Sequence, residues 1–234
     1  MIRAVLFDLE GPIASITEDK LALGLAEKQA AFLAEMELQT DPKRLYRETL
    51  DILQDIELKS AKDDPKANTV LFFWQSLLRK HYAVREEKIA LAMAKKTIDA
   101  VIAISRPHSD VLPALKLLRD SGVKLAVIDP MEKEYISSYL AAHRLDKFFD
   151  VSVSGSEVTL VYPAPDLLAH AANLLGIPAG QCLTVSNKPE CLEGARKAGM
   201  ATCWVERGRN EFLRGKADFQ HKNLERLAEL VKAE

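Results

Sequence analysis

VLFDLEGPI, residues 5–13, is the stretch that decides the fold. Its apolar start has the pattern of a strand buried on both faces, which is typical of parallel sheets. Gly11 and Pro12 then end the strand. Asp8 and Glu10 therefore stand at its C-terminal end, the edge at which open α/β sheets bind their ligands. The sequence thus predicts a site with two carboxyl groups at the end of the first strand.

The composition of the 234 residues fits a globular protein with one core and an inserted or appended piece. Hydrophobic residues make up 48% of the chain and charged residues 28%, enough for a packed core and a charged surface. The formal net charge is −2, so nothing favours nucleic acid or an anionic membrane as a partner. No apolar run approaches the roughly 20 residues that a membrane span needs.

The cysteines indicate the compartment. Cys182, Cys191 and Cys203 are odd in number and form no CxxC pair. Free thiols in a reducing compartment fit this usage better than a disulfide framework. The N-terminus leads directly into the first strand, without the pattern of a signal peptide. We therefore expect a cytoplasmic protein with free thiols.

Two different patterns divide the chain. Between residues 15 and 104, four consecutive helical patterns follow one another with no strand between them, which predicts a small helical bundle. From residue 105 onward, strands and helices alternate, which is typical of right-handed βαβ units on a parallel sheet. We expect strands at 3–8, 123–128, 151–153, 182–185 and 201–205, and helices at 109–121, 132–143, 165–175, 190–198 and 224–232.

The first strand must pair with strands that lie beyond the helical stretch. The fold class is therefore α/β, a doubly wound parallel sheet with an inserted helical bundle. We predict a core domain formed by residues 1–14 and 105–234 and a helical domain formed by residues 15–104.

Four segments, in this order, resemble the motifs of the haloacid dehalogenase (HAD) superfamily, in the subgroup with a helical cap after the first strand. They are residues 5–13 (VLFDLEGPI), 125–130 (LAVIDP), 155–177 (GSEVTLVYPAPDLLAHAANLLGI) and 183–200 (LTVSNKPECLEGARKAGM). The resemblance covers nearly the whole chain and implies a Rossmann-like core with a cap domain. It also implies that a small phosphorylated metabolite, or another small ligand, binds in the cleft between core and cap.

The resemblance assigns roles to the two acids of the first motif. Asp8 would be the nucleophile that takes up a phosphoryl group, and Glu10, where the family usually has Asp, the general acid and base. A carboxylate that merely caps the loop is the alternative for Asp8. Magnesium would be held by the Asp8 carboxylate, the carbonyl oxygen of Glu10 and Asn187, with Asp129 as a further candidate, in a weakened site because the Asn187 amide carries no charge.

The other motifs depart from the family's pattern. Asp129 stands where a Ser or Thr would bind phosphate, Tyr162 where a Lys would, and Asn187 and Cys191 where Asp is usual. We take Asp129, Tyr162 and Lys188 as candidate substrate-binding residues. Each has an alternative: a helix cap for Asp129, packing at a wet edge for Tyr162, and a solvated loop for Lys188.

Two functions follow from these residues. The first is a phosphatase of weak or atypical activity, because each missing electrostatic donor typically costs about 2–4 kcal/mol in the barrier. The alternative is a pseudoenzyme that keeps the fold for binding or regulation. A dehalogenase would also use Asp8, and Ser186-Asn187 resembles part of its fourth motif, but Glu10-Gly11-Pro12 does not fit its first.

Overall fold

The computed structural model describes residues 1–15, 18–59, 64, 66–67, 69–158, 160, 163–207 and 217–232. The chain divides into two compact units. One unit combines residues 1–15 with residues 106–234, and the other consists of residues 16–105. The identity of the second unit as a cap domain stays a prediction.

The described part of the first unit is built on a six-stranded sheet with the order β5-β4-β1-β6-β7-β8. Its strands are β1 (Ala4–Asp8), β4 (Lys124–Asp129), β5 (Val151–Ser154), β6 (Cys182–Ser186), β7 (Ala201–Val205) and β8 (Phe219–His221). All neighbouring pairs are parallel. The chain runs outward on one side of β1 and then on the other, so the predicted doubly wound sheet is confirmed.

Some short elements differ from the prediction. β8 lies in a stretch for which the sequence predicts no strand, and the last helix, α10 (Leu227–Lys232), begins three residues after the predicted start at 224. β2 (Ala14–Ser15) and β3 (Arg106–Pro107) form an unpredicted antiparallel pair. Strands of two or three residues are too short to show a periodic pattern, which explains why these elements were missed.

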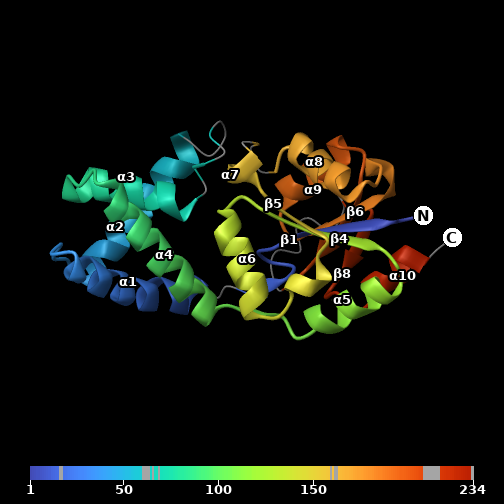
Figure 1. Cartoon of the computed structure of the whole chain (residues 1–234), viewed down its shortest axis with the longest axis horizontal. Helices are drawn as coiled ribbons and strands as arrows, with labels where there is room; N and C mark the ends of the chain where they lie inside the picture. The colour runs from blue at the N-terminus through green and yellow to red at the C-terminus, as the bar shows by residue number, and fades with distance from the viewer. Residues whose placement is uncertain are drawn as a thin grey trace. The chain divides into compact units, whose positions relative to one another are not determined.

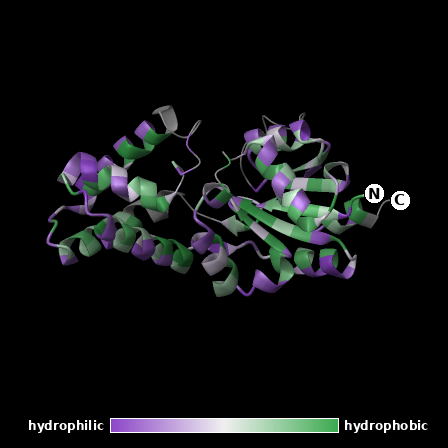
Figure 2. Cartoon of the chain, turned by 45° about the horizontal axis from the view of Figure 1, so that its top comes forward, coloured by the Kyte–Doolittle hydropathy of each residue, from purple (hydrophilic) through white to green (hydrophobic). Residues whose placement is uncertain are grey.

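Helices cover both faces of the sheet (Figure 1). α8 (Pro165–Leu175) and α9 (Pro189–Lys197) lie on one face, and α5 (Val111–Asp120) and α10 lie on the other. The remaining helical segments of this unit are α6 (Lys133–Ala142), η1 (Asp146–Phe148), α7 (Gly155–Val158) and η2 (Ala179–Gln181). The strands are mainly apolar (Figure 2), and Leu6, Ile128, Leu168 and Ala195 join one buried core with α8 and α9.

α9 packs closely against the segment that precedes α8. A Cβ atom on Gly194, in the middle of α9, would lie 2.1 Å from the carbonyl oxygen of Pro163. Only a residue without a side chain fits at this distance, so Gly194 sets how closely α9 can approach. This matters for function because α9 begins directly after Lys188, which is its N-cap residue.

The described part of the second unit consists of helices. They are α1 (Glu18–Glu35), α2 (Pro42–Lys59), α3 (Val70–Tyr82) and α4 (Glu87–Ile104). α2 begins where the sequence predicts, because the Asp41 carboxylate accepts hydrogen bonds from the backbone N–H groups of Lys43 and Arg44 at 3.0 Å. Trp74 is fully buried, and its indole N–H donates to Thr97 Oγ1 at 2.9 Å. None of the helices in the described residues is both long and apolar enough to cross a membrane.

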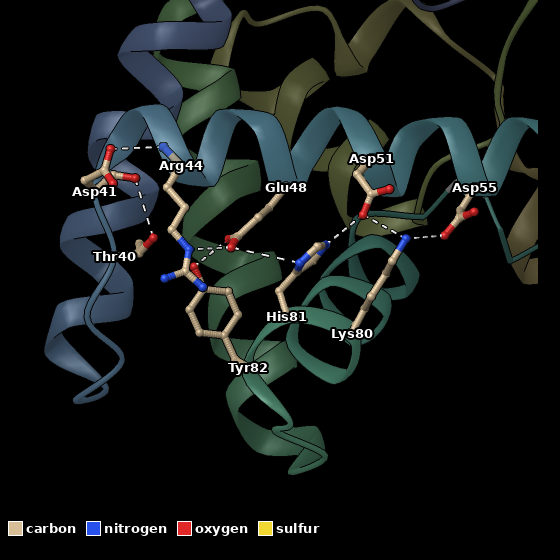
Figure 3. A network of polar contacts seen from close by, with 9 residues as sticks. All are labelled: Thr40, Asp41, Arg44, Glu48, Asp51, Asp55, Lys80, His81 and Tyr82. Carbon is tan, nitrogen blue, oxygen red and sulfur yellow. Dashed lines mark hydrogen bonds and ion pairs between the residues drawn. The ribbon is translucent and has the colours of Figure 1, made fainter.

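Polar side chains join α2 to α3 (Figure 3). The buried Glu48 carboxylate accepts hydrogen bonds from Arg44 Nε at 2.7 Å and from the Tyr82 hydroxyl at 2.8 Å. Burial raises the pKa of Tyr82 to about 12, so the phenol keeps its proton and remains a donor. One turn along α2, Asp51 Oδ2 lies 2.9 Å from His81 Nε2. These contacts hold the two helices in one register.

We predict that Gly194→Ala lowers the free energy of unfolding by about 1–3 kcal/mol, the usual cost of an overpacked contact. The matched control is Gly180→Ala, because a Cβ there would meet nothing within 4 Å. It should change stability by no more than about 0.5 kcal/mol. Urea denaturation of the three proteins measures both values, and equal stability of the two variants would contradict the close approach of α9.

Candidate active site

The C-terminal ends of neighbouring strands bring polar side chains together. β1 ends at Asp8, β4 at Asp129 and β6 at Ser186. β1 lies between the other two strands, and the parallel register places Asp8 opposite Ile128. Side chains from three separate parts of the sequence therefore meet at the edge where the first motif predicts a site.

Asp8 is buried, and its carboxylate is held from one side by groups that follow β6. The Ser186 hydroxyl donates to Asp8 Oδ2 at 2.9 Å, and the same hydroxyl oxygen accepts from the backbone N–H of Lys188 at 3.0 Å. Lys188 Nζ lies 3.5 Å from Asp8 Oδ1 and 3.4 Å from Oδ2. Ser186 thus orients both the carboxylate and the backbone that carries the lysine.

The Lys188 ammonium also faces Glu10. Its Nζ lies 3.7 Å from Glu10 Oε2. Burial alone would lower the pKa of Lys188, but the negative charges of Asp8 and Glu10 outweigh it and hold this pKa above its ordinary value. Lys188 is therefore a full positive charge beside two carboxylates. The structure places Lys188 beside the two acids and not in a solvated loop.

Asp129 lies on the other side of β1 and is 1% exposed. Its Oδ1 accepts from the backbone N–H of Met131 at 2.9 Å, and its Oδ2 has no hydrogen-bond partner among the described residues. Burial raises the pKa of Asp129 to about 8, and the charges of Glu10 and Asp8 add to this while Lys188 opposes it. A carboxyl group that keeps its proton at pH 7 can donate a hydrogen bond to an anion.

The alternative prediction for Asp129, a helix cap, is wrong. Asp129 is the last residue of β4, whereas α6 begins at Lys133 with Glu132 as its N-cap residue. The Asp-Pro pair is followed by a short turn before the helix starts. The Asp129 side chain is therefore left at the strand end, where it meets the other charged groups.

Asn187 packs directly over the loop that follows Asp8. A Cβ atom on Gly11 would lie 1.9 Å from Asn187 Oδ1, and Gly11 has a φ of +100°, so both space and backbone conformation require glycine there. Cys191 is fully buried in the first turns of α9. Tyr162, expected in the slot where the family usually has lysine, lies outside the described residues.

Two other segments hold the same loop in place. Arg207 donates from Nη2 to the carbonyl oxygen of Pro12 and from Nη1 to Asp110 Oδ1, each at 2.7 Å. His108 Nε2 lies 3.1 Å from the carbonyl oxygen of Gly11. Burial would raise the pKa of Asp110, but its hydrogen bond from Arg207 holds this pKa below the usual range. The Arg207–Asp110 pair was missed from the sequence, because the two residues are far apart in the chain.

The residues at this site do not fit the expected magnesium ion. Among the described residues, no three His, Cys, Asp or Glu side chains form a cluster that could hold a metal. The Lys188 ammonium lies against the carboxylates of Asp8 and Glu10. Asn187 supplies only a neutral amide, and the thiol of Cys191 is a poor ligand for a hard cation.

A family model described as haloacid dehalogenase-like hydrolase matches residues 2–199. The chain belongs to the haloacid dehalogenase-like hydrolase family.

The proteins that this chain resembles are named for different activities. The chain is 28% identical over 229 residues to a glyceraldehyde 3-phosphate phosphatase from Methanopyrus kandleri, covering 93% of this chain and 90% of the relative. It is 28% identical over 214 residues to (S)-2-haloacid dehalogenase 2 from a Pseudomonas species, covering 90% and 86%. The crystal structure of a HAD phosphatase from Thermococcus onnurineus matches all of this chain and 99% of the relative, with a TM-score of 0.74 and 22% identity.

We predict that Asp129→Asn stabilises this HAD protein more at pH 8 than at pH 5. The folded chain keeps the Asp129 proton up to a pKa of about 8, whereas the unfolded chain releases it near about 3.9. The folded state thus binds more protons between these values, so its stability falls as pH rises through that window. The neutral amide has no such titration.

The measurement is the melting temperature of both proteins at pH 5 and pH 8. About 1 kcal/mol corresponds to roughly 2–4 °C for a chain of this size. The rise in melting temperature caused by Asp129→Asn should therefore be several degrees larger at pH 8 than at pH 5. Asp120→Asn, at the exposed end of α5, is the control and should not show the effect. A gain of the same size at both pH values would contradict a buried, protonated Asp129.

Proposed function

We propose that this chain is a phosphatase that hydrolyses a small phosphorylated metabolite through an aspartyl-phosphate intermediate. The observation that carries the proposal is the Lys188 ammonium, 3.4 Å from the Asp8 carboxylate. Phosphoryl transfer depends mainly on positioning and on neutralising the charge of the transferred group. Lys188 supplies beside Asp8 the positive charge that the third motif lacks. The glyceraldehyde 3-phosphate phosphatase among the relatives supports this choice of substrate class.

The first chemical step assigns one role to each acid. An Asp8 oxygen attacks phosphorus, the bond between phosphorus and the ester oxygen breaks, and Glu10, which must enter this step in its protonated form, gives its proton to the departing oxygen. The side chain of Glu10 is 39% exposed, so it can reach a leaving group. In the second step a water molecule, deprotonated by Glu10, attacks phosphorus, which releases inorganic phosphate and restores the Asp8 carboxylate.

The surrounding groups orient Asp8 and stabilise the negative charge of the phosphoryl group during these steps. Ser186 holds one oxygen of Asp8 and thereby directs the other toward the substrate. Lys188 reduces the repulsion between the Asp8 carboxylate and the phosphate anion. Asp129, neutral at pH 7, donates a hydrogen bond to a phosphoryl oxygen in the place of the usual Ser or Thr. Each such donor is typically worth about 2–4 kcal/mol of the barrier.

The pseudoenzyme alternative depends on the absence of a counter-charge for Asp8. The contact between Lys188 and Asp8 weakens that reason, because the positive charge comes from the fourth motif instead of the third. We therefore favour catalysis over a purely binding role. The loop that carries Glu10 is also held by Arg207 and His108, as a positioned acid and base requires.

We predict that the wild-type protein hydrolyses p-nitrophenyl phosphate and that Asp8→Asn reduces the rate on the order of 10³-fold or more, because the nucleophile is lost. Asp166→Asn, an exposed carboxylate in the first turn of α8, is the matched control and should keep the wild-type rate. All assays are run both in EDTA and in magnesium. Mass spectrometry of rapidly quenched enzyme should detect a phosphoryl group on Asp8.

The same proteins are tested on 2-chloropropionate, since one relative is a haloacid dehalogenase. Release of chloride without any phosphatase activity would show that Asp8 attacks carbon and would overturn the proposal. Equal phosphatase rates for the wild type and Asp8→Asn would remove Asp8 as the nucleophile.

A further inference from the structure

We propose that Lys188 alone supplies the positive charge beside Asp8, in place of both the third-motif lysine and a metal ion, so that this phosphatase works without magnesium. The inference rests on the proposed phosphatase function and concerns the group that neutralises its site. It starts from the disagreement between the magnesium that the family resemblance implies and the side chains that surround Asp8.

The ammonium stands where a dication would have to bind. Lys188 Nζ lies 3.4 Å and 3.5 Å from the two oxygens of Asp8 and 3.7 Å from Glu10 Oε2. A metal ion held by the Asp8 carboxylate would lie within a few ångströms of the ammonium and would be repelled by it. The Asp8 carboxylate is thus already paired with a positive charge, which weakens its attraction for a metal.

The position of the ammonium is built into the backbone. Lys188 is the N-cap residue of α9, with Pro189 directly after it in the first turn. Its backbone N–H donates to the Ser186 hydroxyl, which itself donates to Asp8. Only about a quarter of the Lys188 side chain is exposed. The lysine is thus fixed at its base and directed inward, as a permanent component of the site would be.

The fourth motif, where carboxylate ligands are usual, gives magnesium little to bind. Magnesium requires close to octahedral coordination by oxygen atoms and favours carboxylates. After the two acids of the first motif, the fourth motif adds the neutral amide of Asn187 and the buried thiol of Cys191. The Asn187 amide is also packed against the backbone of Gly11. Within the described ranges no metal cluster of His, Cys, Asp and Glu is formed.

A lysine can perform two of the tasks that a metal performs in phosphoryl transfer. It neutralises the carboxylate that must approach an anion, and with its N–H donors it contacts an oxygen of the transferred group. It does not activate water, a step that Glu10 performs as general base. With an ammonium in place of a dication, both chemical steps therefore still have the groups they need: Lys188 neutralises charge and Glu10 transfers the protons.

The first test compares the hydrolysis of p-nitrophenyl phosphate in excess EDTA and in millimolar magnesium. We expect the wild type to keep its activity in EDTA, with magnesium changing the rate by less than about threefold. Lys188→Gln should lose most of its activity in EDTA. Lys197→Gln, whose exposed lysine lies on the same helix and pairs with Glu193, should behave as the wild type. A wild type that is inactive in EDTA and restored by magnesium would overturn the inference.

The second test measures magnesium binding without turnover. Melting temperatures are recorded with and without magnesium, because a ligand that binds the folded state raises the melting temperature. The wild type should show no rise, whereas Lys188→Gln, with its carboxylates freed, should show one. A rise in the wild type that Asp8→Asn abolishes would contradict the inference. If no phosphate ester is hydrolysed under either condition, the proposed function fails, and the melting temperatures still decide the metal question.

Discussion

The pairing of the Lys188 ammonium with the Asp8 carboxylate is the interaction on which the site depends. The side chain of Asp8 is fully buried, and an isolated charge in such a place is strongly unfavourable unless it is paired and hydrogen-bonded. Lys188 and Ser186 provide these partners from the end of β6 and the start of α9. The parallel pairing of β1 with β6 thus brings a carboxylate and its counter-charge together.

The site separates its carboxyl groups by their surroundings. Asp8 and Glu10 lie against the ammonium of Lys188, whereas Asp129 lies across β1 with one oxygen that has no partner among the described residues. A pKa of about 8 leaves Asp129 neutral at pH 7. Neighbouring acids whose environments differ in this way can take different chemical roles, one as a charged nucleophile and another as a hydrogen-bond donor.

The sequence was sufficient for the architecture and for part of the site. The alternation of strands and helices predicts the doubly wound sheet, and the acids after the first strand predict the edge at which the candidate site lies. β8 escaped prediction because three residues show no period. The location of Lys188 stayed open because hydrophobic periodicity does not tell which way the side chain of a loop residue points. Arg207 and Asp110 were missed because only the folded chain brings them together.

The most direct measurement of the central claim is a double-mutant cycle between Asp8 and Lys188, followed by the free energy of unfolding. Asp8→Asn, Lys188→Gln and the double variant give the coupling energy of the pair. A contact of the kind seen between these two side chains should give a favourable coupling of about 0.5–3 kcal/mol. Additive effects, with a coupling below about 0.3 kcal/mol, would show that the two charges do not interact and would contradict this account of the site.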